Sequence, residues 1–462
     1  MIKLNILSIL VSIIVICIAI SCTGRRMIPG KTEEVTSSPI APYTSVTLDN
    51  GLNVIVKEIH TTPIVAVYLW CNTGSINEEE RVQGISHFYE HMFFKGTEKR
   101  GVGEIDRAIK SLGGYNNAFT SKEFTAYYVV LPSENFSLAA DVLVDAIRNS
   151  SFLEEEIEKE RGVIKEEINR KEDDPTGNMY EELFKVIFPE TPYAHPVLGT
   201  KESVSNITRE DFRNYLGTYY VPNNMTAVVV GDVTAAHAIK EIHRLTADWK
   251  KNPDVEHHLA KFSVPRRDGV QGFELEKDVT MSYVMMAFQT SGMTDVKEYA
   301  ALDVASSILG EGKSSRLYSR LVEKEQVVSS VQAYIYPLKN SGLFVIFATM
   351  DRNNVQNFRK SILEEIVKLR TNPLGQEELK KVQTMLKADY QFSNETGSNI
   401  AYTLGYFNTL GMLVRATEYE RSIDEVTVND VSMYVTKVLD PDSYTIGIVN
   451  PRGQADTGVR DE

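Results

Sequence analysis

Cysteine is scarce in this chain, with only three among 462 residues. Cys17 and Cys22 lie in or beside an apolar segment at the N-terminus, and Cys71 lies alone further along. If Cys22 carries a lipid after processing, as discussed below, no two cysteines remain to pair. The sequence therefore predicts a processed protein without an internal disulfide, in which Cys71 belongs to a buried strand.

Positive charge is also in short supply. The chain has 49 Lys and Arg against 63 Asp and Glu, a formal net charge of −14. This deficit argues against nucleic acid as a partner. Hydrophobic residues make up 42% and charged residues 24%, which excludes a disordered or fibrous chain. The length is sufficient for two or three globular domains.

Two of the eight histidines have the spacing of metal ligands. His87 and His91 stand four residues apart, and Glu90 directly precedes the second. On a helix turning about 100° per residue, both imidazoles lie on one face and Glu90 lies at its edge. Such a pair can bind one zinc ion and leave the carboxylate free for proton transfer, an inverted H-x-x-E-H motif. The alternative is two surface histidines on an ordinary amphipathic helix, so a third ligand decides between them.

An acidic helix predicted over residues 154–170 offers that ligand. Its predicted apolar stripe consists of Leu153, Ile157, Ile164 and Ile168. Glu160 and Glu167 project roughly 20° apart on one flank of this stripe, whereas Glu166 projects toward solvent. A buried carboxylate needs a cation or a hydrogen bond. The geometry therefore favours Glu167 over its neighbour.

The two motifs together resemble peptidase family M16, the pitrilysin- or insulinase-like zinc metallopeptidases, and in particular the shorter group that includes mitochondrial processing peptidase. In that family H-x-x-E-H is followed about 75 residues later by an E-R-x-x-x-x-x-E helix. Glu160 to Glu167 matches this helix here, and the resemblance runs from about residue 45 to about residue 450. It implies that His87, His91 and Glu167 bind Zn²⁺, with Glu90 as general base and Glu160 orienting a ligand.

Residues 113–120 also resemble the family, where this stretch forms an edge strand beside the zinc. An unpaired edge strand can bind an extended peptide through its backbone. Asn117 and Ala118 are therefore the candidate substrate-binding residues. The alternative is an ordinary hairpin.

The resemblance implies an α+β fold of two homologous α/β-sandwich halves, each a mainly antiparallel sheet with helices on one side, forming a clamshell. The sequence itself indicates a duplication, because a strand over residues 282–288 and a helix over 299–309 repeat the strand at 64–71 and the histidine helix without the metal residues. The predicted organisation is a signal peptide (1–22), a tether (23–44), a zinc-bearing domain (45–250), a linker (251–271), a second domain (272–450) and a tail (451–462).

The N-terminal segment has a basic start at Lys3 and a mostly apolar run over residues 4–20, and it ends in Ala-Ile-Ser-Cys at Cys22. This end resembles a bacterial lipobox, so we predict a membrane-attached lipoprotein of the cell envelope. An uncleaved anchor, favoured slightly by Arg25 and Arg26, and a plain secretory signal are the alternatives.

One departure from the family concerns the second domain. Active single-chain relatives supply an Arg and, seven residues later, a Tyr that polarise the scissile carbonyl. Val322 and Ser329 occupy those positions here, while Arg316, Arg320 and Tyr334 stand at other offsets. We therefore expect a zinc endopeptidase subunit for unfolded or extended peptides, paired with an M16-like subunit that carries the Arg/Tyr pair, or else a homodimer. The alternative is a non-catalytic assembly subunit of the same fold.

Overall fold

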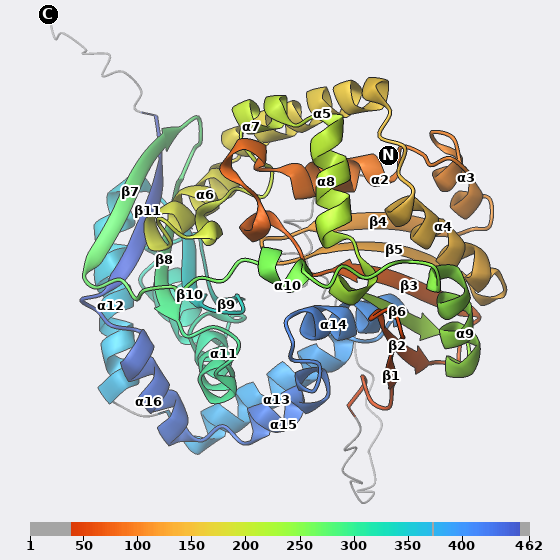
Figure 1. The fold of residues 1–462 in the computed structure, drawn as a ribbon. Helices are drawn as coiled ribbons and strands as arrows, with labels where there is room; N and C mark the ends of the chain where they lie inside the picture. The colour runs from red at the N-terminus through yellow and green to blue at the C-terminus, as the bar shows by residue number, and fades with distance from the viewer. Residues whose placement is uncertain (1–37, 372–373, 453–462) are drawn as a thin grey trace, which may run out of the picture.

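The computed structural model describes residues 38–371 and 374–452 (Figure 1). The predicted signal peptide, most of the tether and all but the first two residues of the predicted tail lie outside these residues. Ile40, which the sequence assigned to the tether, is fully buried and packs on the first sheet. Within the described ranges, no helix combines the length and the apolar character needed to cross a membrane.

Six strands form the first sheet, on the right in Figure 1. Their spatial order is β1-β2-β6-β3-β5-β4, and only the β2–β6 pair is parallel. Strand β3, one of the two central strands, is buried in all but its first residue, as its apolar sequence predicted. The strands are β1 (Thr44–Thr47), β2 (Asn53–Glu58), β3 (Ile64–Cys71), β4 (Tyr115–Thr120), β5 (Thr125–Pro132) and β6 (Met225–Gly231).

The second sheet repeats the path of the first without β1. Its order is β7-β11-β8-β10-β9, and only the β7–β11 pair is parallel. The last strand of each half thus inserts at the same place, β6 between β2 and β3 and β11 between β7 and β8, which supports the predicted duplication. The strands are β7 (Val270–Lys277), β8 (Ser282–Thr290), β9 (Ser330–Pro337), β10 (Gly342–Met350) and β11 (Tyr444–Pro451).

Helices flank both sheets. The first half contains α2 (Ile85–Phe93), α3 (Glu104–Lys110), α4 (Phe136–Arg148), α5 (Glu154–Asp173), α6 (Pro175–Ile187), α7 (Lys201–Asn206), α8 (Arg209–Tyr219) and α9 (Ala235–Thr246), and α10 (Val255–His258) lies in the connection. The second half contains α11 (Val296–Gly310), α12 (Val355–Thr371), α13 (Gln376–Ser393), α14 (Gly397–Thr409), α15 (Arg415–Asp424) and α16 (Val428–Val438).

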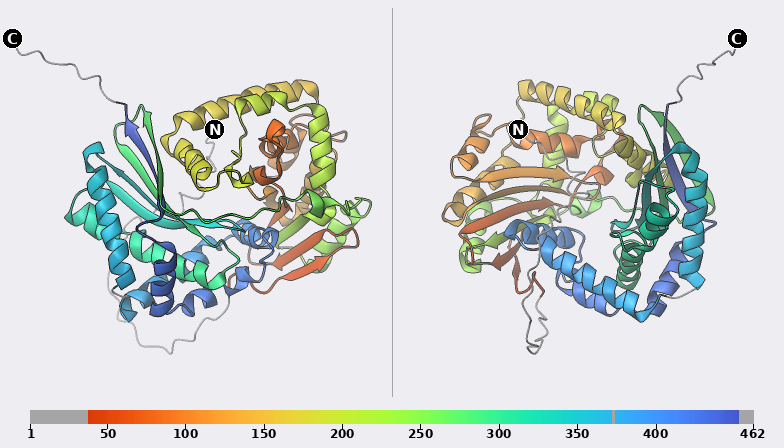
Figure 2. Two further views of the ribbon diagram at one scale, coloured as in Figure 1. Left: turned by 60° about the vertical axis from the view of Figure 1, so that its left-hand side comes forward. Right: turned by 180° about the vertical axis from the view of Figure 1, so that it is seen from behind.

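The predicted fold class is confirmed, and the structure adds an exchange of helices between the halves (Figure 2). One face of the first sheet packs on helices of its own half, and α14 of the second half covers the other face. In return, α6 of the first half packs on the second sheet. Both faces of a buried strand need apolar cover. The exchange supplies that cover and holds the halves together.

Candidate metal centre

Helix α2, which carries the histidine motif, begins at a glycine with a left-handed backbone (Gly84, φ 90°) and has no local side-chain cap. Its first amides are instead bound by the buried carboxylate of Glu78, which accepts the N–H of Gly84 at 2.7 Å and that of Ser86 at 2.9 Å. Burial raises the pKa of Glu78 to about 7. Glu78 was missed by the sequence analysis because it lies outside any local capping pattern.

Helix α5 is fixed against α2 by Arg161. Its guanidinium binds the carbonyls of Val204 and Ile207 at the end of α7 and lies over the ring of Phe88, 5.5 Å from the centroid. Three residues of the predicted stripe, Ile157, Ile164 and Ile168, are buried, but the prediction for Leu153 was wrong. That residue is 45% exposed because it precedes the helix, where the backbone is extended.

His87, His91 and Glu167 are brought together between these two helices. The carboxylate oxygen Oε2 of Glu167 lies 3.7 Å from Nε2 of His87 and 3.6 Å from Nε2 of His91. One donor atom of each residue lies within 4.8 Å of the others, and no second such group was found in residues 38–371 and 374–452. Glu166 is exposed and outside the group.

This donor set fits zinc. Two imidazole nitrogens and a carboxylate oxygen are typical zinc ligands, and tetrahedral bonds of about 2.0–2.1 Å place ligand atoms about 3.3–3.4 Å apart. The two donor separations at Glu167 exceed that spacing by only a few tenths of an ångström. Three protein ligands leave one position for water or substrate, as in catalytic zinc sites.

The electrostatics of the group suit a cation. Burial lowers the pKa of His87 to about 3, so its imidazole is neutral and able to ligate. Burial would also lower the pKa of His91, but the hydrogen bond with Glu160 and the nearby carboxylate of Glu167 raise it to about 9. Burial opposes ionisation of Glu167, yet His91 and His87 hold the pKa of that carboxyl near 2. The carboxylates around the two imidazoles thus favour a positive charge at this position.

Glu160 binds the ring of His91 from the side away from the ligand atoms. Its Oε2 lies 2.9 Å from Nδ1 of His91, and its Oε1 lies 2.6 Å from Nζ of Lys95. The contact fixes which nitrogen of His91 faces Glu167. Glu160 therefore lies where it can orient His91.

Glu90 lies beside the group but outside it. Its side chain is buried, which raises its pKa to about 7, and its Oε2 accepts a hydrogen bond from the hydroxyl of Thr120 at 2.7 Å. Thr120 ends β4, so the strand and the carboxylate are joined directly. Thr120 was not among the predicted site residues, although it lies two residues beyond the predicted substrate-binding residue Ala118.

Among the residues that the structure describes, strand β4 pairs only with β5 and forms one edge of the first sheet. Asn117 is exposed, whereas the side chain of Ala118 is buried in the core. The backbone N–H of Ala118 donates to the side-chain oxygen of Asn117 at 2.9 Å. This amide therefore faces the free edge, where an extended peptide can pair with the strand.

The second half offers no polarising pair at the positions that the family uses. Val322 packs on the core of the second half, and Ser329 is exposed. Arg316 is ion-paired with Glu378, and the hydroxyl of Tyr334 meets that of Tyr180. Arg320 is likewise held by carboxylates, at Glu325, Glu364 and Glu365.

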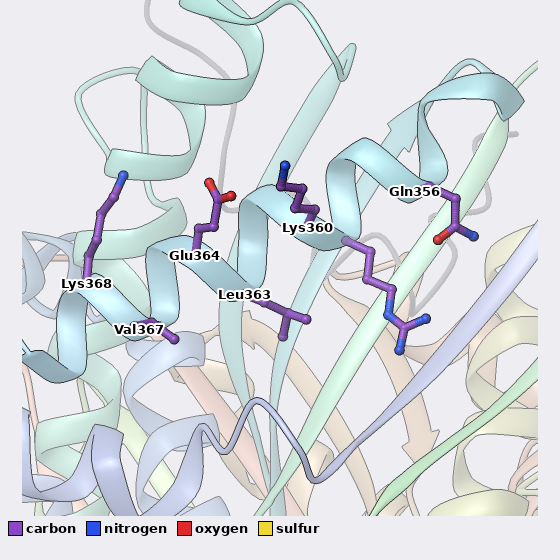
Figure 3. A pocket seen from close by; sticks show the side chains of 7 residues that line it. Gln356, Lys360, Leu363, Glu364, Val367 and Lys368 are labelled. Carbon is purple, nitrogen blue, oxygen red and sulfur yellow. The ribbon is translucent and has the colours of Figure 1, made fainter.

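A surface hollow of about 620 Å³ lies elsewhere, on the second half (Figure 3). Every residue that lines it belongs to α12, among them Lys360, Leu363 and Lys368. None of these residues belongs to the candidate metal centre.

The fold and the ligand group together match the class of zinc peptidases that carry an inverted H-x-x-E-H motif. Residues 53–201 match the family model described as Insulinase (Peptidase family M16), and residues 206–386 match the model described as Peptidase M16 inactive domain. The chain belongs to peptidase family M16.

Relatives of known name agree with this assignment. The chain is 28% identical over 408 residues to an uncharacterized zinc protease, YmxG, of Bacillus subtilis, covering 88% of this chain and 98% of the relative. It is 28% identical over 421 residues to a probable mitochondrial-processing peptidase subunit beta of Arabidopsis thaliana, covering 89% and 79%. The crystal structure of a protease from Helicobacter pylori is similar at a TM-score of 0.81 and 27% identity, covering 89% of this chain and all of that one.

Proposed function

We propose that this chain is a zinc-dependent endopeptidase subunit that cleaves unfolded or extended peptides in the bacterial envelope. The observation that carries the proposal is the combination of a complete ligand group, His87, His91 and Glu167, with a buried glutamate that is free of it. Glu90 lies one residue from a ligand and is hydrogen-bonded to a strand whose outer edge is open.

His87, His91 and Glu167 would hold the zinc ion. When bound, zinc supplies Lewis acidity, which favours both ionisation of a water and polarisation of a carbonyl. The backbone of β4 around Ala118 binds the peptide in extended form and presents its carbonyl beside α2. Glu90 accepts the proton of the attacking water and returns it to the leaving amine. A pKa near 7 suits a group that must do both.

The variant Glu90→Gln tests this assignment. It should retain zinc and bind a fluorescent peptide, but cleave it at least about a hundredfold more slowly, the lower range for loss of a positioned base. Glu98→Gln, an exposed glutamate of the same region, is the matched control. Cleavage by Glu90→Gln at the wild-type rate would remove Glu90 from the mechanism, and a wild-type chain that binds zinc but cleaves no peptide with any partner would refute the function.

We further propose that the active form is a heterodimer with an M16-like subunit that keeps the Arg/Tyr pair, with a homodimer as second choice. Val322 and Ser329 cannot replace the missing donors, and one oxyanion donor is typically worth about 3 kcal/mol. Arg316 and Arg320 are engaged by carboxylates of the second half. If the chain alone, shown by mass spectrometry to be free of any partner, cleaves peptides as fast as the mixture, the heterodimer proposal is wrong.

The missing Arg/Tyr pair also favours a second candidate function, a non-catalytic assembly subunit. The complete ligand group and the buried Glu90 argue against it, because neither is needed for assembly. Zinc content and peptide cleavage in the complex purified with its native partner separate the two functions.

The envelope location is proposed from the leader sequence, which lies outside the described residues. Cys22 is the candidate lipidation site. Membrane fractionation of the wild type and of Cys22→Ser tests it. Loss of membrane attachment in the variant supports lipidation, and attachment that persists favours an uncleaved anchor.

A further inference from the structure

The turn between β4 and β5 is hydrogen-bonded to the second half of the chain. This turn, residues 121–124, contains Glu123, whose side chain is only 7% exposed. Its Oε1 accepts a hydrogen bond from the hydroxyl of Tyr193 at 2.6 Å and from the backbone N–H of Lys339 at 3.0 Å. Its Oε2 lies 3.2 Å from the same amide. Lys339 belongs to the turn between β9 and β10, so one carboxylate joins the two halves.

Neighbouring contacts make this junction rigid. The hydroxyl of Tyr193 also accepts the N–H of Asn340 at 3.3 Å, and Nζ of Lys122 donates to the carbonyl of His195 at 2.8 Å. Within the turn, the N–H of Ser121 donates to the carbonyl of Phe124 at 2.8 Å, which closes the hairpin. A shift of Glu123 therefore moves the end of β4.

Thr120 is the residue of β4 directly before this turn, and its hydroxyl binds Glu90. We propose that Glu123 is a positioning residue, which anchors the end of β4 to the second half and thereby holds the hydrogen bond between Thr120 and Glu90. This inference rests on the proposed function, since it assigns a role in catalysis to a contact outside the ligand group. It also gives the half without metal ligands a part in aligning the base.

The charge of Glu123 explains why a carboxylate is needed here. A buried carboxylate gives charge-assisted hydrogen bonds to the phenol and to the amide, which are stronger than neutral ones. Glutamine would place an N–H group against one of these donors. We therefore expect Glu123→Gln to show a smaller form of the defect seen in Glu123→Ala.

A double-mutant cycle in kcat tests the coupling. Glu123→Ala and Thr120→Val should each lower kcat, by about tenfold or more for a base displaced by a fraction of an ångström. If Glu123 acts through Thr120, the double variant should be no more than about twofold slower than the slower single variant. Losses that multiply would overturn the proposal, because they would show a general structural effect. Zinc content should remain at the wild-type value in all three variants.

Hydrogen exchange tests the same proposal without relying on enzymatic activity. Peptides spanning residues 115–125 should exchange at least about threefold faster in Glu123→Ala, because the anchor of the hairpin is lost. Tyr193→Phe, which removes one hydroxyl, should show the same change at smaller size, and the exposed Glu134→Ala should show none. Unchanged exchange in Glu123→Ala would overturn the proposal even if the wild type proves inactive, whereas inactivity of the wild type alone refutes only the proposed function.

Discussion

Replacing Glu160 tests how strongly zinc affinity depends on a residue that does not itself bind the ion. Its carboxylate is nearly buried and bridges Nδ1 of His91, at 2.9 Å, and Nζ of Lys95, at 2.6 Å. Without it, the ring of His91 can rotate, and either nitrogen can carry the proton. Part of the free energy of zinc binding must then be used to order the ring of His91.

Two substitutions of Glu160 should lower the zinc affinity by different factors. Loss of a residue that orients a ligating histidine typically costs about 10- to 100-fold in metal affinity, or about 1.4 to 2.8 kcal/mol. Glu160→Gln keeps an oxygen for His91 but turns an amide N–H toward Lys95, so we expect a loss near tenfold. Glu160→Ala removes both contacts, and its loss should approach a hundredfold.

Competition with a chromogenic chelator, at one fixed pH for all variants, measures these dissociation constants directly. Glu155→Gln is a matched control, because Glu155 lies on the same helix but is exposed and pairs with Lys159 at the surface. Circular dichroism should show that all variants keep the wild-type fold. Affinities of Glu160→Ala and wild type that agree within about twofold would refute the orienting role.

Three further predictions concern the ligands and the junction of the halves. Glu167→Gln should lose zinc while Glu166→Gln keeps about one ion per chain by metal analysis, and the reverse result would overturn the helix-face argument. Apparent zinc affinity should rise as the pH is raised toward about 9 and should level off above that pH, because the ion must displace the proton of His91. A zinc affinity that calorimetry shows to be independent of pH would contradict this prediction. Gly405→Ala should lower the free energy of unfolding by about 1–3 kcal/mol or more. The new Cβ would lie 2.0 Å from the indole nitrogen of Trp70, which is buried on β3. Its control in urea denaturation is Gly217→Ala, where the space is open and the stability should not fall.

Most of the secondary structure could be predicted from local periodicity in the sequence. The apolar runs that became β3 and β8 predicted buried strands directly, because a strand covered on both faces has a nearly continuous hydrophobic sequence. The spacing of His87 and His91, and the choice of Glu167 over Glu166, likewise follow from the period of a single helix. These features depend on neighbours within one or two turns of the chain.

Other parts of the site depend on contacts between distant segments. Glu78 caps α2 from outside the helix, and Thr120 reaches Glu90 across 30 positions. Leu153 was wrongly predicted to be buried, because periodicity does not show where the helix begins. Each of these outcomes was decided by where a loop or strand end came to lie.

The exchange of helices between the halves was decided by tertiary structure alone. Apolar residues on both faces of β3 show that two layers must cover it, but not that α14 arrives from the other end of the chain. The same holds for Glu123, whose partner Lys339 is 216 positions away. Sequence by itself determined which residue types could bind zinc and transfer a proton. Only the folded chain decided which of them meet, because burial and hydrogen-bond partners at such separations depend on how whole sheets pack rather than on any local pattern.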